Sequence, residues 1–78
     1  MKTVKVYSTS NCPWCHRVKD YLKDKNISFE DIDVAKDVEK AKEMVKKSGQ
    51  MGVPVITVDD EVVIGFDQNK LNKLLGLS

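Results

Sequence analysis

Two cysteines separated by two residues are the feature of this sequence best suited to chemistry. Cys12 and Cys15 are the only cysteines among the 78 residues. A thiolate attacks a disulfide sulfur, and a second thiol nearby can then resolve the mixed disulfide, so this spacing suits thiol–disulfide exchange. The same spacing suits a structural disulfide poorly, because a bridge that closes a loop of only a few residues restricts the unfolded chain little. The pair therefore indicates redox chemistry rather than a structural staple.

The residues around the pair predict that it opens a helix. Pro13 suits the first helical position, because its missing N–H would have no partner there. Unpaired N–H groups and a partial positive charge at a helix N-terminus stabilise a thiolate. Cys12 is placed to accept from the free amide of Trp14 or Cys15, which makes Cys12 the predicted nucleophile. Cys15, one turn inward on the apolar side, is the predicted resolving thiol.

Pro13 and Trp14 are candidates for tuning the pKa and the redox potential of the cysteine pair. Pro13 is a good first-turn residue in any helix, and it also stands where it can affect the redox potential. Trp14 can shield the thiols or offer an aromatic contact surface. Neither side chain has chemistry of its own to contribute to disulfide exchange.

Metal chemistry is an alternative use of the same segment. Cys12-Pro13-Trp14-Cys15-His16 also matches the CxxCH pattern of c-type haem attachment, with Met44 or Met51 as a second axial ligand. A zinc site needs four ligands, which two cysteines and one histidine do not complete unless two chains share the metal. A binding module with incidental cysteines is a further alternative. The prediction for this chain is no resident metal.

The composition predicts a single globular domain over residues 1–78. Hydrophobic residues make up 41% of the sequence and charged residues 32%, a balance unlike that of disordered or membrane-spanning proteins. The formal net charge is +1, and lysines and acids are interleaved, apart from a local basic patch of Arg17 and Lys19. We therefore expect a monomer with neither a nucleic acid nor a membrane as partner.

The first residues do not form a secretory signal. Met1 to Val6 contain no long apolar segment and no small-residue cleavage site. Reduced thiols are the rule in the cytosol, so a chemically active cysteine pair fits that compartment. We expect a cytoplasmic protein.

Hydrophobic periodicity and capping residues predict seven elements in the order β-α-β-α-β-β-α. The predicted elements are a strand over Lys2–Tyr7, a helix from Pro13 to about Lys25-Asn26, a strand over Ile27–Val34, a helix from Asp37 to Gly49, strands over Val53–Val58 and Glu61–Ile64, and a helix from Asp67 to Gly76. Ser8 to Asn11 are expected to form a polar loop. Because a strand–helix–strand unit is parallel and right-handed, and a hairpin is antiparallel, the predicted fold is α/β with a four-stranded mixed sheet and three helices.

Apolar stripes predict which helix faces are buried. On the first helix the inward residues are Cys15, Val18 and Leu22, with Tyr21 beside them, and the outward residues are Arg17, Lys19, Asp20 and Lys23. On the second helix the predicted stripe is Val38, Ala41, Met44 and Val45, and on the third it is Leu71, Leu74 and Leu75.

Three short motifs together resemble the glutaredoxin family of the thioredoxin superfamily. They are Cys12-Pro13-Trp14-Cys15 after the opening strand, Val53-Pro54 before a strand, and Gly65-Phe66-Asp67 before the last helix. The resemblance covers nearly the whole chain and implies a thioredoxin-like fold and a dithiol–disulfide oxidoreductase that reduces protein or glutathione mixed disulfides. It also implies a cis peptide bond at Pro54, with the Val53 backbone pairing with the substrate, and a γ-glutamyl site at Gly65, Phe66 and Asp67.

Several departures from the family pattern leave the electron donor open. Thr9 and Met51 stand where the family usually has basic residues for the glycine carboxylate of glutathione, and Gly52 replaces the usual threonine before Val-Pro. Gly65-Phe66 resembles redoxins that accept electrons from thioredoxin reductase, although their cysteine motif usually lacks a proline. The resemblance implies no bound cofactor and a donor that is either glutathione as co-substrate or a thioredoxin-reductase-type flavoprotein. Cluster-binding members usually lack the proline too, so Pro13 counts against an iron–sulfur cluster carrier.

Overall fold

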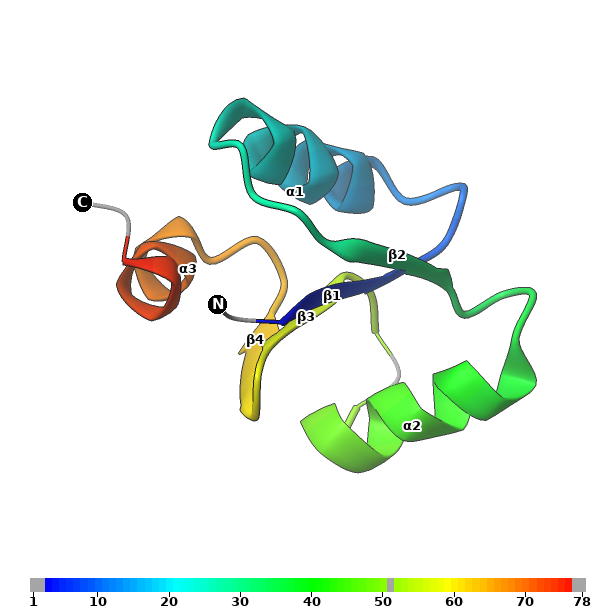
Figure 1. The fold of residues 1–78 in the computed structure, drawn as a ribbon. Helices are drawn as coiled ribbons and strands as arrows, with labels where there is room; N and C mark the ends of the chain where they lie inside the picture. The colour runs from blue at the N-terminus through cyan, green and yellow to red at the C-terminus, as the bar shows by residue number, and fades with distance from the viewer. Residues whose placement is uncertain (1–2, 51, 77–78) are drawn as a thin grey trace.

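A four-stranded mixed sheet forms the centre of the molecule, and helices cover both of its faces (Figure 1). The computed structural model describes residues 3–50 and 52–76. Lys2, expected in the first strand, and Met51, considered as a haem ligand, lie outside the described residues. Helices α1 and α3 lie on one face of the sheet and α2 lies on the other.

The predicted order of elements is confirmed. The elements are β1 (Val4–Ser8), α1 (Pro13–Asp24), β2 (Glu30–Asp33), α2 (Val38–Ser48), β3 (Val55–Val58), β4 (Glu61–Ile64) and α3 (Gln68–Leu75). The strands lie in the order β2-β1-β3-β4, with β1 parallel to β2 and the other two pairs antiparallel. The sheet is therefore mixed, as the strand–helix–strand unit followed by a hairpin predicts.

Three of the four strands have boundaries that differ from the prediction. Ser8 was expected in a loop, but it belongs to β1 because it pairs with Asp33 of β2, and its side chain is buried. The second strand is shorter than Ile27–Val34, because the Ile27 amide instead donates to Leu22 at the end of α1. Val53 and Pro54 precede β3, where Pro54 has no N–H to offer to a ladder.

The helix ends follow local capping chemistry and were predicted correctly. Asp37 accepts from the Lys40 amide, and Asp67 accepts from the Lys70 amide, so each aspartate caps the helix that follows it. The αL conformation of Gly49, with φ of 76°, ends α2, as expected for a glycine stop.

Two hydrophobic clusters lie on opposite faces of the sheet. The cluster beneath α1 and α3 consists of Val4, Val6, Val18, Leu22, Ile56, Val58, Val63 and Leu71. The cluster beneath α2 consists of Tyr7, Ile32, Met44 and Val55. Because β1 and β3 both send alternate side chains into the two clusters, they form the centre of the core.

The predicted apolar stripe of α2 is only partly correct. Met44 is buried, but Val38 is 65% exposed. At 3.6 residues per turn, Val38 lies about 120° around the helix axis from Met44, so the two side chains do not share one buried face. Val38 instead belongs to the outer side of α2.

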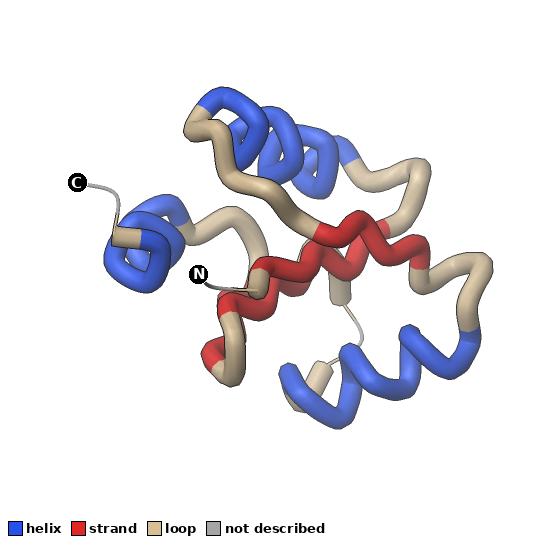
Figure 2. The backbone as a smooth tube through the Cα atoms, in the orientation of Figure 1, coloured by secondary structure: helices blue, strands red, loops and turns tan. Residues whose placement is uncertain are grey.

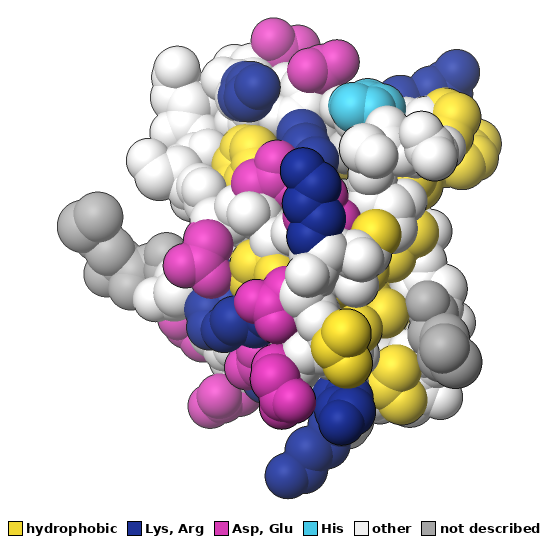
Figure 3. All heavy atoms as spheres, turned by 90° about the vertical axis from the view of Figure 1, so that its right-hand side faces the viewer, with side chains coloured by type: hydrophobic (Ala, Val, Ile, Leu, Met, Phe, Trp, Pro, Cys, Tyr) yellow, Lys and Arg dark blue, Asp and Glu magenta, His cyan; other side chains and the backbone are white. Residues whose placement is uncertain are grey.

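Charges of both signs are mixed on the surface. On the face drawn in Figure 3, acidic and basic side chains alternate, and apolar side chains gather in a band along one side. None of the helices in residues 3–50 and 52–76 combines the length and apolar character needed to cross a membrane.

Candidate active site

Cys12 caps the N-terminus of α1 with its sulfur. The loop that joins β1 to α1 brings it there (Figure 2). Its backbone is extended, with φ of −104° and ψ of 107°, and its Sγ accepts the backbone N–H of Cys15 at 3.2 Å. This contact was predicted from the sequence. Because Pro13 carries no N–H and the next amides have no helical partner, the cysteine sulfur takes the place of the usual oxygen cap.

Cys15 lies behind Cys12 and is fully buried, whereas Cys12 is partly exposed. Burial first, and then the hydrogen bond to Cys12, raise the pKa of the Cys15 thiol to about 11. The backbone N–H of Thr9 and the Lys19 ammonium act in the opposite direction. At neutral pH Cys15 is therefore a protonated thiol, and Cys12 is the sulfur that a substrate can reach.

The Val53–Pro54 segment lies directly against the first cysteine. The Cys12 thiol donates to the Val53 carbonyl, with a sulfur–oxygen distance of 3.9 Å. The Val53–Pro54 peptide bond is cis, as the family resemblance implied. The Pro54 carbonyl in turn accepts the Gly65 amide at 2.9 Å. The Val53–Pro54 segment thus connects Cys12 to the segment that begins at Gly65.

The segment before α3 combines a turn, a packed ring and a helix cap. Gly65 has a φ of 75°, a conformation that side chains other than glycine rarely adopt. The Phe66 ring packs edge-on against Tyr21 of α1, with ring centroids 5.4 Å apart, so it helps to join α3 to α1. Tyr21 also donates a hydrogen bond to Asn72 of α3, a contact that the sequence did not predict.

Trp14 projects into solvent. It is 55% exposed, and the Arg17 guanidinium lies over its ring, 4.7 Å from the centroid. This cation–π contact holds the indole at the surface beside the cysteines. An exposed aromatic ring suits a contact surface.

The other potential metal ligands lie apart. The Nε2 atom of His16 is 3.2 Å from the Ser10 carbonyl, and Met44 is buried under α2. Within residues 3–50 and 52–76, no group of three or more His, Cys, Asp or Glu side chains is arranged to hold a metal ion.

Sequence reasoning wrongly placed Lys19 in water. Its side chain is only 14% exposed, and its Nζ lies 3.0 Å from Asp31 Oδ2. Ser8 Oγ donates to the other oxygen of the same carboxylate at 3.1 Å. A signal was present in the sequence, because Lys19 follows Cys15 by four residues and so lies on the same side of α1.

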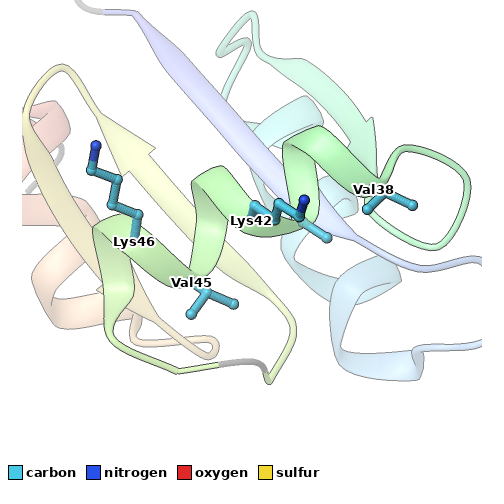
Figure 4. A pocket seen from close by; sticks show the side chains of 5 residues that line it. Val38, Lys42, Val45 and Lys46 are labelled. Carbon is cyan, nitrogen blue, oxygen red and sulfur yellow. The ribbon is translucent and has the colours of Figure 1, made fainter.

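An apolar groove follows the outer side of α2, away from the cysteines. Its volume is about 440 Å³, and its lining residues are Val38, Ala41, Lys42, Val45 and Lys46. Figure 4 shows Val38 and Val45 projecting from the same side of the helix. None of the predicted site residues lines this groove.

Comparison with protein families and relatives agrees with the geometry. The family model described as Glutaredoxin matches residues 4–63. A glutaredoxin-like 8.6 kDa protein of the rubredoxin operon of Clostridium pasteurianum is 47% identical over 72 residues, which cover 92% of this chain and 96% of that protein. Glutaredoxin 3 of Escherichia coli K12 is 37% identical over 86% of this chain and 81% of its own length. The glutaredoxin-like protein NrdH of Lactococcus lactis is 39% identical over 91% of this chain and 97% of its own length.

The fold is shared with solved structures. A variant of the thioredoxin-like protein BC3987 superimposes with a TM-score of 0.92 and 36% identity, and the match covers 100% of both chains. The thioredoxin-like fold expected from the sequence is thereby confirmed. With a cysteine pair at the start of α1, a cis proline beside it and a family match over most of its length, this chain belongs to the glutaredoxin family.

Proposed function

We propose that this protein is a dithiol–disulfide oxidoreductase that works through Cys12-Pro13-Trp14-Cys15. The observation that carries the proposal is the Cys12 sulfur at the head of α1, 3.2 Å from the Cys15 amide, with the buried Cys15 thiol behind it. Backbone N–H groups at a helix start favour negative charge on a capping sulfur. The glutaredoxin family supports thiol–disulfide exchange as the reaction class.

The reaction has two exchange steps. The Cys12 thiolate attacks one sulfur of a substrate disulfide, and the other half of the substrate leaves as a thiolate that takes up a proton. Cys15 then loses its proton and attacks Cys12 Sγ, so that the Cys12–Cys15 disulfide forms and the second half of the substrate leaves. The substrate gains two electrons and two protons, and a donor dithiol or two donor thiols later restore the Cys12–Cys15 pair.

A Cys15→Ser variant tests this order of events. It retains the nucleophile but cannot resolve the intermediate, so mixed disulfides between Cys12 and substrate proteins should accumulate. Mass spectrometry of the unreduced adducts locates the bond. If Cys15→Ser instead reduced protein disulfides at the parent rate, Cys12 would be shown to work alone.

The electron donor is glutathione or a thioredoxin-reductase-type flavoprotein. For glutathione, the Val53 backbone offers strand-like pairing, and the first turn of α3 after Gly65 and Asp67 offers amides for a carboxylate. Thr9 and Met51, which stand where the family usually has basic residues, carry no positive charge for the glycine end of glutathione. NADPH consumption coupled through glutathione and its reductase, compared with coupling through thioredoxin reductase, identifies the donor.

Adding a positive charge at position 9 should improve the use of glutathione. We expect Thr9→Lys to lower KM for glutathione about two- to fivefold, the effect of one exposed ion pair, with little change in kcat. The gain should shrink as salt is added. Thr9→Gln is the matched control, because it lengthens the side chain without a charge; equal KM values for the two variants would show that charge is not the cause.

The proposal includes the setting of the reaction. Residues 1–78 act as one glutaredoxin-like domain, a monomer that meets disulfide-containing proteins in the cytoplasm, where thiols are kept reduced. Trp14 and Arg17 form part of the surface that such proteins contact. Protein purified without oxygen should show no visible absorbance; the spectrum of a haem or an iron–sulfur cluster would contradict the assignment.

A further inference from the structure

A partly buried ion pair connects α1 to the sheet near the cysteines. Lys19 Nζ lies 3.0 Å from Asp31 Oδ2, and the Lys19 side chain is 14% exposed. Ser8, whose side chain is buried, donates to Asp31 Oδ1 at 3.1 Å. The carboxylate is thus fixed by β1 and by its own strand β2, and it fixes the ammonium of α1 in turn.

The ammonium is held on the side of α1 that carries the resolving cysteine. Four residues advance an α-helix by slightly more than one turn, so Lys19 lies about 40° around the axis from Cys15 and one turn further along. Two other cations of α1 are less suited to act on Cys15: Arg17 is stacked on Trp14, and Lys23 is exposed to water. A charge held away from bulk water acts more strongly on a buried neighbour than an exposed one does.

The groups that raise or lower the pKa of Cys15 change during the reaction. In the free dithiol, burial, the hydrogen bond to Cys12 and the Cys12 charge all raise the pKa of Cys15, whereas the Thr9 amide and Lys19 lower it. Once Cys12 is bound in a mixed disulfide, its sulfur carries neither a proton nor a charge. Burial is then opposed by the Thr9 amide and Lys19, so Cys15 ionises more readily at the stage when it must attack.

We propose that Lys19, anchored by Asp31 and Ser8, is a positioning residue for the second exchange step: its ammonium stabilises the Cys15 thiolate that attacks Cys12 Sγ. The inference rests on the proposed dithiol function. In this step the Cys15 proton passes to solvent, the Cys12–Cys15 bond forms, the bond from Cys12 to the substrate breaks, and the substrate thiolate that leaves takes up a proton.

A coloured aromatic disulfide separates the two steps. Dithiobis-nitrobenzoate releases one coloured thiolate when Cys12 attacks it and a second when Cys15 displaces the group left on Cys12. For Lys19→Gln we expect the first release to keep its rate within about twofold and the second to slow. Each unit by which the Cys15 pKa rises leaves about tenfold less thiolate but a more nucleophilic one, so the net slowing is about threefold.

Matched variants separate charge from structure. Lys23→Gln, one turn further along the same helix, should release both thiolates at the parent rates. Lys19→Arg keeps the charge and should retain most of the parent rate of the second release. The pH profile of that release should shift to higher pH only in Lys19→Gln. Cys12 and His16 beside Cys15, and Asp31 beside Lys19, are present in every variant. Lys19→Arg also keeps the cationic partner of Asp31, so comparing it with Lys19→Gln isolates the charge at position 19.

Some outcomes would overturn the inference and leave the proposed function intact. A second release with parent rate and parent pH profile in Lys19→Gln would do so, and so would equal slowing of both steps. If the parent itself shows no first release that depends on Cys12, the dithiol function fails instead.

A second measurement leaves Lys19 unchanged and so does not depend on the folding of a variant. Blocking Cys12 of the parent protein with iodoacetamide imitates its uncharged state in the mixed disulfide. Titration of Cys15 by NMR should then give a lower pKa than in the free dithiol. An equal or higher pKa would contradict the claim that Cys15 ionises more readily once Cys12 is uncharged.

Discussion

Replacing Cys12 by serine should abolish disulfide reduction, with kcat/KM reduced about a thousandfold or more. A serine hydroxyl is not ionised near neutral pH and is a poor nucleophile toward sulfur, so the first exchange step is lost. Serine is also among the best N-cap residues, and the Cys12 sulfur already performs that task for the Cys15 amide. The fold should therefore be preserved while the chemistry is removed.

The measurement is turnover of a protein disulfide and of a glutathione mixed disulfide under saturating donor. Cys15→Ser is the matched control: the same substitution three residues later keeps the first step, so this variant should accumulate a mixed disulfide that Cys12→Ser does not form. Urea denaturation of both variants checks that stability is retained. Full activity of Cys12→Ser on either substrate would show that another group attacks the disulfide.

Features fixed by neighbouring residues could be predicted from the sequence. The contact between the Cys12 sulfur and the Cys15 amide follows from the proline after Cys12 and the free amides of a first helical turn. The caps at Asp37 and Asp67 depend on bonds that span three residues. Such interactions need no knowledge of the sheet, and this is why the cysteine pair could be assigned to a helix start.

Features that depend on strand register could not be predicted in the same way. Lys19 meets Asp31 because β2 pairs in parallel with β1, with Asp31 opposite Val6 and Asp33 opposite Ser8. Strands shifted by one residue would turn Asp31 to the other face of the sheet. The ion pair of Lys19 with Asp31 and the burial of Ser8 are therefore products of tertiary pairing, although the spacing from Cys15 places Lys19 on the inner side of α1.

The contact of the Val53–Pro54 segment with Cys12 was accessible only through the family resemblance. No local pattern relates position 12 to position 53, because that contact joins separate segments. The hydrogen bond between Gly65 and Pro54, by contrast, continues the β3–β4 hairpin, in which Val55 lies opposite Ile64. The same resemblance did not predict how the Phe66 ring packs, since its contact with Tyr21 depends on how α3 lies beside α1.

Shortening Leu22 to alanine should destabilise the protein more than any surface change. Leu22 is fully buried among the residues that join α1 and α3 to the sheet. Removing a buried leucine side chain usually costs about 2–5 kcal/mol. A domain of this size rarely has more than about 3–5 kcal/mol of net stability, so a large part of it should be lost. Because α1 carries both cysteines, disulfide reduction should fall in parallel with the folded fraction.

Urea denaturation followed by circular dichroism measures the effect, and Val38→Ala is the control. The sequence pattern also places Val38 in the apolar stripe of its helix, but Val38 is 65% exposed on α2. Its truncation should therefore change the free energy of unfolding by less than about 0.5 kcal/mol. Because alanine has the higher helix propensity, a slight gain in stability is consistent with this placement. A loss at Val38 as large as the loss at Leu22 would mean that the outer side of α2 is buried in solution.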